Sequence, residues 1–333
     1  MNMCFEVGND LMFEEILPNL YRIEIPLPNN PLKALNSYVI KSEGRFLVID
    51  TGMNREECKR EMFSDLEKLH VDLKNTDFFI THLHADHLGL VASLVTDTST
   101  VYFNREEIAI IDSQERWQKL YAFYLSNGFP EYELKKALEG HPGYRYGLKQ
   151  HLDFCILNEG DPIEIGDYHF RCIETPGHSP GHMCLYEANK KILVSGDHVL
   201  FDITPNISSW FEMENSLKEY LASLEKIYSL DVNLVLPGHR SLWNNHRMRI
   251  RELEQHHQAR LNEVLTALED GEKTAFEIAP YVTWDVDYGS WELFPASQKY
   301  FAVGETIAHI RYLEEEAMIR RKTQGDKVVF SLE

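Results

Sequence analysis

At residues 81–87 the chain reads Thr81-His82-Leu83-His84-Ala85-Asp86-His87, which places three histidines and one aspartate within six residues. The apolar run at 77–80 predicts a buried strand before it, and the apolar residues from Leu88 onward predict a helix after it. Residues two apart at a strand end face the same way, so His82 and His84 can bind one metal ion. The turn into the helix directs Asp86 and His87 to a neighbouring position, so one segment can supply ligands to two metal ions.

Three later segments repeat one design, in which a strand ends, a glycine turn follows, and the turn carries a side chain that can bind metal. They are Thr175-Pro176-Gly177-His178, Ser195-Gly196-Asp197 and Pro237-Gly238-His239. Their order and spacing indicate that several strand ends converge on one pocket.

Together these segments supply five histidines and two aspartates, a ligand set that suits zinc and also iron or manganese. In the natural partition, one metal ion binds His82, His84 and His178. The other binds Asp86, His87 and His239, and Asp197 bridges the two ions. Two cations roughly 3.5 to 4 Å apart can hold a hydroxide between them, because the pKa of bound water falls to about 7. We expect this hydroxide to be the nucleophile.

Residues outside the ligand set are expected to support it or to contact substrate. Asp50 is predicted to accept the second N–H of a ligand histidine, and His182 is assigned a supporting role. His198 directly follows Asp197, so its side chain should point the other way. Substrate contacts are expected from Tyr144, Phe201 and Trp210.

Length, charge and cysteine content limit the class of protein. The 333 residues favour two domains, and the formal net charge of −20 disfavours binding to nucleic acid or to an anionic membrane. No run approaches the ~18 to 20 apolar residues of a membrane span, and residues 1–10 show no basic region followed by an apolar one. The five cysteines form no C-x-x-C pair, which favours reduced thiols. We expect a cytoplasmic protein.

The order of predicted elements favours an α/β layered domain at 1–243. Strands are expected at 20–25, 37–40, 45–49, 77–80, 100–103, 154–157, 162–165, 168–174, 182–186, 191–194 and 233–236, and helices at 55–69 and 217–228. Residues 104–150 differ from this pattern: one long helix reaching Tyr124, a second at 131–138 and an aromatic loop at 141–147 are predicted. This insertion either packs on the sheet or forms a lid over the site.

The segment 244–333 is predicted to be a separate C-terminal domain. Helices are expected at 245–268, 275–282 and 297–319, followed by a hairpin with a strand at 327–330, an order that resembles a winged helix. From Arg247 onward 11 basic residues face 16 acidic ones, a net charge of −5. That charge argues against DNA binding, so packing or formation of a homodimer is the expected role.

The motifs together resemble the metallo-β-lactamase superfamily. The matching elements are Asp50-Thr51-Gly52, His82-x-His84-x-Asp86-His87, His178 in TPGHSPGH, Asp197 in SGD and His239 in PGH. The resemblance implies an αβ/βα sandwich with a dinuclear metal site on its edge, and it implies the same seven ligands.

Substrate does not follow from the resemblance, because one site serves many reactions in this superfamily. Asp197 argues against β-lactam hydrolysis. Glyoxalase II is similar in all seven ligands, but Ser241 and Asn206 stand where its glutathione-contacting tyrosine and lysine are expected. Acyl-homoserine lactonases have a tyrosine where this chain has Leu200.

The leading interpretation is a dinuclear metal-dependent hydrolase of a small acyl substrate, a thioester, ester or lactone, with Asp86 and Asp197 as catalytic carboxylates. Two alternatives remain open. Persulfide dioxygenases share a similar THxHADH motif but use a single iron. A single-strand endoribonuclease group of the same superfamily also carries a winged-helix-like C-terminus.

Overall fold

Two β-sheets form the centre of the computed structural model, which describes residues 13–285 and 288–333. In the first sheet the strands follow chain order, antiparallel from β1 to β4 and parallel from β4 to β7. Its strands are β1 (Phe13–Leu17), β2 (Leu20–Pro26), β3 (Ala34–Ser42), β4 (Arg45–Ile49), β5 (Thr76–Phe79), β6 (Val101–Asn104) and β7 (Cys155–Leu157).

The second sheet has the order β12-β11-β10-β9-β8. Its strands are β8 (Pro162–Ile165), β9 (Tyr168–Glu174), β10 (Met183–Glu187), β11 (Ile192–Gly196) and β12 (Leu234–Pro237). Neighbours in this sheet are antiparallel except β11 and β12, which are parallel and therefore end at the same edge.

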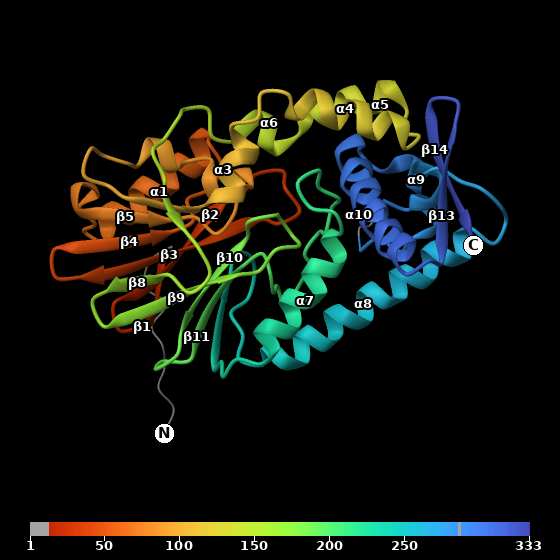
Figure 1. Cartoon of the computed structure of the whole chain (residues 1–333). Helices are drawn as coiled ribbons and strands as arrows, with labels where there is room; N and C mark the ends of the chain where they lie inside the picture. The colour runs from red at the N-terminus through yellow and green to blue at the C-terminus, as the bar shows by residue number, and fades with distance from the viewer. Residues whose placement is uncertain (1–12, 286–287) are drawn as a thin grey trace.

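The two sheets pack face to face, and helices cover their outer faces (Figure 1). The buried layer between the sheets joins Ile40 and Leu47 of the first to Leu185 and Val194 of the second. Alternate residues of the first sheet point outward and bury the apolar face of α1 (Glu56–Lys68), while α7 (Ser216–Tyr228) packs on the second sheet. This is the expected αβ/βα sandwich.

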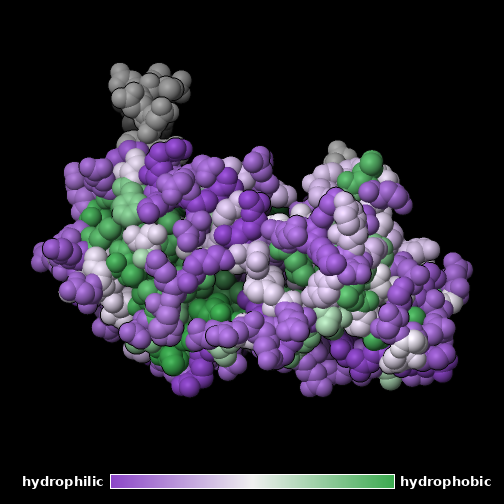
Figure 2. Space-filling model, turned by 90° about the horizontal axis from the view of Figure 1, so that it is seen from above, coloured by the Kyte–Doolittle hydropathy of each residue, from purple (hydrophilic) through white to green (hydrophobic). Residues whose placement is uncertain are grey.

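The C-terminal region, residues 244–333, packs beside α7 and against the insertion at 104–150. Its elements are α8 (His246–Ala267), α9 (Ala275–Ile278), α10 (Ala296–Glu315), β13 (Ile319–Gln324) and β14 (Lys327–Leu332). In Figure 1 the insertion helices extend from the sandwich to this region. Tyr124 stacks on Tyr300 at 4.2 Å between ring centroids, and Lys299 Nζ donates to Glu133 at 2.7 Å. Seen from above, a hollow separates the sandwich from the C-terminal region (Figure 2).

Several local predictions were wrong. The helix expected after the histidine cluster is the single turn α2 (Ala85–Leu88), followed by a 3-10 turn at Val91–Ser93. The long insertion helix is two helices, α3 (Arg105–Ile111) and α4 (Arg116–Ser126), and the expected aromatic loop contains the short helix α6 (Pro142–Tyr146). The helix expected at 297–319 is α10, which ends at Glu315, and Ile319 is already the first residue of β13.

Other predictions agree with the structure or lie outside it. The second insertion helix is α5 (Glu131–Gly140), and helices followed by the hairpin β13–β14 have the expected order, although the winged-helix likeness itself stays a prediction. Cys58, Cys155, Cys172 and Cys184 are free thiols. Cys4 and residues 1–10, on which the expected absence of a secretion signal rests, lie outside the described residues. No helix in the described ranges has both the length and the apolarity needed to cross a membrane.

Candidate metal centre

The predicted ligands lie at strand ends along one edge of the sandwich. His82 and His84 follow β5, and the next turn, α2, carries Asp86 and His87. The other three ligands come from the second sheet: His178 follows β9, Asp197 directly follows β11, and His239 follows β12. Segments that are distant in sequence are thus brought to one place by the two sheets.

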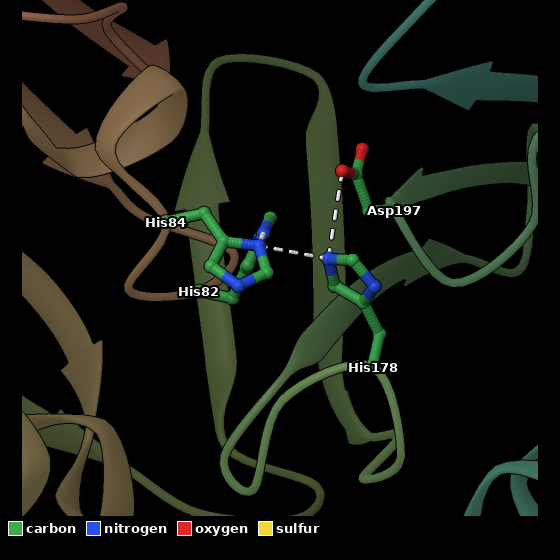
Figure 3. Close-up of side chains that lie close together, drawn as sticks. All are labelled: His82, His84, His178 and Asp197. Atoms are coloured by element: carbon green, nitrogen blue, oxygen red, sulfur yellow. Dashed lines mark hydrogen bonds and ion pairs between the residues drawn. The ribbon is translucent and has the colours of Figure 1, made fainter. Parts of the chain in front are cut away.

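The first ligand group consists of His82, His84, His178 and Asp197 (Figure 3). His84 Nδ1 lies 2.9 Å from His82 Nε2 and 2.9 Å from His178 Nε2. His178 Nε2 is 3.6 Å from Asp197 Oδ2. In the close-up the His84 and His178 rings point toward each other from different loops. One ligand atom of each residue lies within 4.8 Å of all the others, so the four can surround a single cation.

The second ligand group consists of Asp86, His87 and His239. His239 Nε2 lies 3.4 Å from Asp86 Oδ2. Asp197 Oδ2 lies 3.5 Å from His87 Nε2 and 3.5 Å from His239 Nε2. A single oxygen of Asp197 therefore lies near histidine nitrogens of both groups, which is the position predicted for a bridge.

The chemistry of the pocket fits divalent cations. His87 Nε2, His239 Nε2 and Asp197 Oδ1 are buried and have no hydrogen-bond partner, and buried polar atoms normally have one. Burial, and next the charge of His87, hold the pKa of His82 well below its usual value, so its ring offers a lone pair. Burial alone would lower the pKa of His239, but Asp197 and Asp86 raise it to about 10. A metal ion would replace that proton.

Asp50 supports the second group as predicted. Its Oδ2 accepts from His87 Nδ1 at 2.7 Å and from Thr81 Oγ1 at 2.9 Å, and its Oδ1 accepts from the Thr81 N–H at 2.9 Å. Asp50 holds a positive φ of 58° at the end of β4, which an aspartate tolerates better than most residues. The carboxylate fixes the ring so that His87 Nε2 faces the pocket.

His182 supports Asp197 and is engaged at both ring nitrogens. Its Nε2 accepts from the Asp197 backbone N–H at 3.2 Å, so the neutral ring carries its proton on Nδ1 and donates to Thr175 Oγ1 at 2.8 Å. A Cβ on Gly196 would lie 2.7 Å from His182 Nε2, and Gly196 has a φ of +47°. Only glycine leaves room for this contact at the turn that carries Asp197.

Glu107 of α3 holds two ligand loops together, a role that the sequence did not lead us to predict. Its Oε2 accepts from the Leu83 N–H at 2.7 Å, between His82 and His84. Its Oε1 accepts from Ser179 Oγ at 2.7 Å and from the Gly181 N–H at 2.6 Å, just after His178. The sequence did offer one signal for this role, because Glu107 is an acidic residue on the apolar face of a predicted helix.

Replacing Glu107 with alanine should lower both metal content and stability. The change leaves three donors without their acceptor, and each unsatisfied buried group costs about 1 to 3 kcal/mol. Denaturant unfolding and metal analysis measure the two effects. Its exposed neighbour Glu106 is the matched control, and Glu106→Ala should change neither. Full metal occupancy in Glu107→Ala would contradict the role assigned to this carboxylate.

The C-terminal region supports His178 through Asn206. His178 Nδ1 donates to the Asn206 carbonyl at 2.9 Å, and Asn206 Nδ2 donates to Glu305 Oε2 at 2.6 Å. Glu305 lies on α10, is buried and forms an ion pair with buried Arg260 of α8. No pattern in the sequence indicated this link, because its partners are about 100 residues apart.

A cavity of about 1180 Å³ opens beside the ligands, between the sandwich, the insertion and the C-terminal region. The candidate ligands His84, Asp86, His178 and Asp197 line it. The insertion supplies much of its wall, from Ile111 to Tyr124 and from Gly140 to Lys149.

The three predicted substrate contacts have different positions. Trp210 lines the cavity, and its ring stacks on His84 at 6.0 Å between centroids. Tyr144 is 51% exposed and is not among the lining residues, whereas its neighbours Arg145 and Tyr146 are. Phe201 also lies outside the lining and stacks on Trp243.

Comparisons with known proteins agree with this architecture. Residues 32–239 match the family model of the metallo-beta-lactamase superfamily. A probable metallo-hydrolase of Bacillus subtilis, YqjP, is 25% identical over 88% of this chain and 92% of its own. An atrochrysone carboxyl ACP thioesterase of Aspergillus fumigatus is 24% identical over 76% of this chain and 69% of its own.

Among solved structures, a metallo-beta-lactamase family protein of Thermus thermophilus superposes with a TM-score of 0.81 at 29% identity. The match covers 96% of this chain and 100% of the other, so the C-terminal region belongs to the shared architecture. The family match spans more than half of the sequence and contains all seven candidate ligands. The prediction of a metal-dependent hydrolase is thereby confirmed, and the chain belongs to the metallo-β-lactamase superfamily.

Proposed function

We propose that the protein is a dinuclear hydrolase that cleaves an ester-like bond, a thioester, ester or lactone, in a small acyl substrate. The observation that carries this proposal is the position of Asp197 Oδ2, 3.5 to 3.6 Å from histidine nitrogens of both ligand groups. A carboxylate placed between two such groups suits a pair of cations better than one.

Two divalent ions, zinc first and iron or manganese next, fit the mixture of imidazole and carboxylate ligands. Such ions lower the pKa of bound water and polarise a carbonyl oxygen. The chain itself fixes the geometry, because Asp50, His182 and Glu107 hold the ligand segments by hydrogen bonds.

Asp86 and Asp197 are the proposed catalytic carboxylates. Both line the cavity, so both can reach a bound substrate. Burial alone would raise the pKa of Asp86, but the nearby His239 and His87 lower it to about 2. Asp86 is therefore ionised at neutral pH and can orient the attacking water or pass a proton to the leaving group.

The cavity supports a small-molecule substrate. Its wall combines aromatic side chains with many polar and charged ones, and its volume of about 1180 Å³ can enclose a small molecule. The formal net charge of −20 disfavours a nucleic-acid substrate. A relative named as a thioesterase supports the thioester as the first bond to test.

Metal analysis of anaerobically purified protein, followed by a panel of thioesters, esters and lactones, tests the proposal. We expect about two metal ions per chain and hydrolysis of at least one class, lost on chelation and restored by zinc. A single iron with oxygen consumption on a persulfide would instead establish the dioxygenase. Cleavage of single-stranded RNA without any ester hydrolysis would establish the nuclease.

A further inference from the structure

Arg116, the first residue of α4, places a positive charge on the cavity wall close to the metal centre. Its guanidinium carbon lies 5.4 Å from the ring centroid of Trp117 and 5.5 Å from that of Trp210. Trp210 in turn stacks on the ligand His84 and donates its indole N–H to the His178 carbonyl at 3.1 Å. Only one tryptophan ring therefore lies between Arg116 and the metal-binding histidines.

Within the described ranges, the Arg116 guanidinium forms no ion pair and no hydrogen bond with a protein group. Two other arginines on the wall, half-buried Arg55 and buried Arg260, are paired with Glu57 and Glu305. Glu212 acts on Arg116 through its charge but makes no ion pair with it. Burial lowers the pKa of Arg116, yet an arginine side chain stays charged in proteins.

A partly buried, unpaired guanidinium is unusual, because buried charges are normally paired. Stacked aromatic rings reduce the cost of desolvating it but give its N–H donors no acceptor from the protein. A carboxylate or phosphate satisfies two such donors at once. The missing partner is then an anionic group that a ligand brings into the cavity.

We propose that Arg116 binds an anionic group of the substrate, a carboxylate or phosphate, while the bond to be cleaved lies at the metal centre. The substrate class becomes an acyl compound that carries a negative charge on its acyl part or on its leaving group. The part of this inference that concerns the cleaved bond rests on the proposed function. The binding of an anion by Arg116 does not depend on it.

Two pairs of thioesters test the proposal with full-length, metal-loaded protein. In the first pair the acyl part is glutarate or its neutral monoamide, with one neutral thiol. In the second pair the leaving group is 3-mercaptopropionate or its amide, with one acetyl group. We expect wild type to prefer the charged member of at least one pair by about 10- to 100-fold in kcat/KM, the range for a hydrogen bond to a charged group.

Arg116→Gln should abolish this preference through KM, while Arg116→Lys should keep part of it. Lys119→Gln is the matched control, because it removes the same charge from an exposed position of the same helix. It should keep the full preference.

Glutarate binding, measured by calorimetry on the same three variants and wild type, gives a readout that does not need turnover. We expect about tenfold weaker binding in Arg116→Gln alone. If no thioester, ester or lactone is cleaved but this loss is seen, the proposed function fails and the anion site stands. Equal rates for both members of each pair, or glutarate binding that is unchanged in Arg116→Gln, would overturn the assignment.

Discussion

Asp197→Asn should reduce the metal content from about two ions per chain to about one or fewer and lower turnover by at least about a hundredfold. An amide oxygen is a weaker ligand than a carboxylate, and Asp197 Oδ2 is the atom nearest to histidines of both groups. Loss of a residue that merely orients a ligand already costs about 10- to 100-fold in affinity or activity, so loss of the bridge should cost more. Elemental analysis and steady-state kinetics measure the two quantities.

Asp231→Asn provides the matched control, since Asp231 is an exposed aspartate that pairs with Lys191 away from the ligands. It should keep both metal ions and full turnover. Circular dichroism establishes that the Asp197 variant is folded, which separates loss of the metal site from loss of the protein. Two tightly held ions and normal turnover in Asp197→Asn would contradict the dinuclear proposal.

The candidate ligand segments could be identified from the sequence because the signal was local. Each ligand segment follows a short apolar run, and the two packed sheets bring these strand ends to a common edge. His182 was expected to begin a strand instead of following one, and it lies directly before β10 (Met183–Glu187). The structure places both ring nitrogens of His182 on other partners.

The cavity wall was harder to predict because it depends on local helix breaks and long-range pairs. The expected long helix is interrupted between Ile111 and Arg116, which places Arg116 at the start of a new helix beside the cavity. Residues 142–146 form a helix and not a loop, so Tyr144 and Tyr146 face different ways although they are two apart. No spacing in the sequence indicates the contact between Asn206 and Glu305.

Glu305→Ala should destabilise the protein by about 3 to 5 kcal/mol, because removal of one partner leaves the other charge of a buried pair unpaired. Arg260 is that partner, and it lies in the interior beside Trp284. The same change removes Glu305 Oε2, the closer of two acceptors of the Asn206 side-chain amide, while the Asn206 backbone carbonyl accepts from His178. We therefore also expect metal affinity, measured by competition with a chelator, to fall about tenfold.

A double variant, Arg260→Met with Glu305→Leu, separates these two effects. Apolar replacement of both partners of a buried ion pair is often neutral or stabilising, so the free energy of unfolding should return close to the wild-type value. The Asn206 amide still lacks its carboxylate acceptor, so metal affinity should stay low. Recovery of both stability and metal affinity would mean that Glu305 serves only the fold. Recovery of stability alone would make the C-terminal region part of the metal site, because α10 then determines how firmly His178 is held.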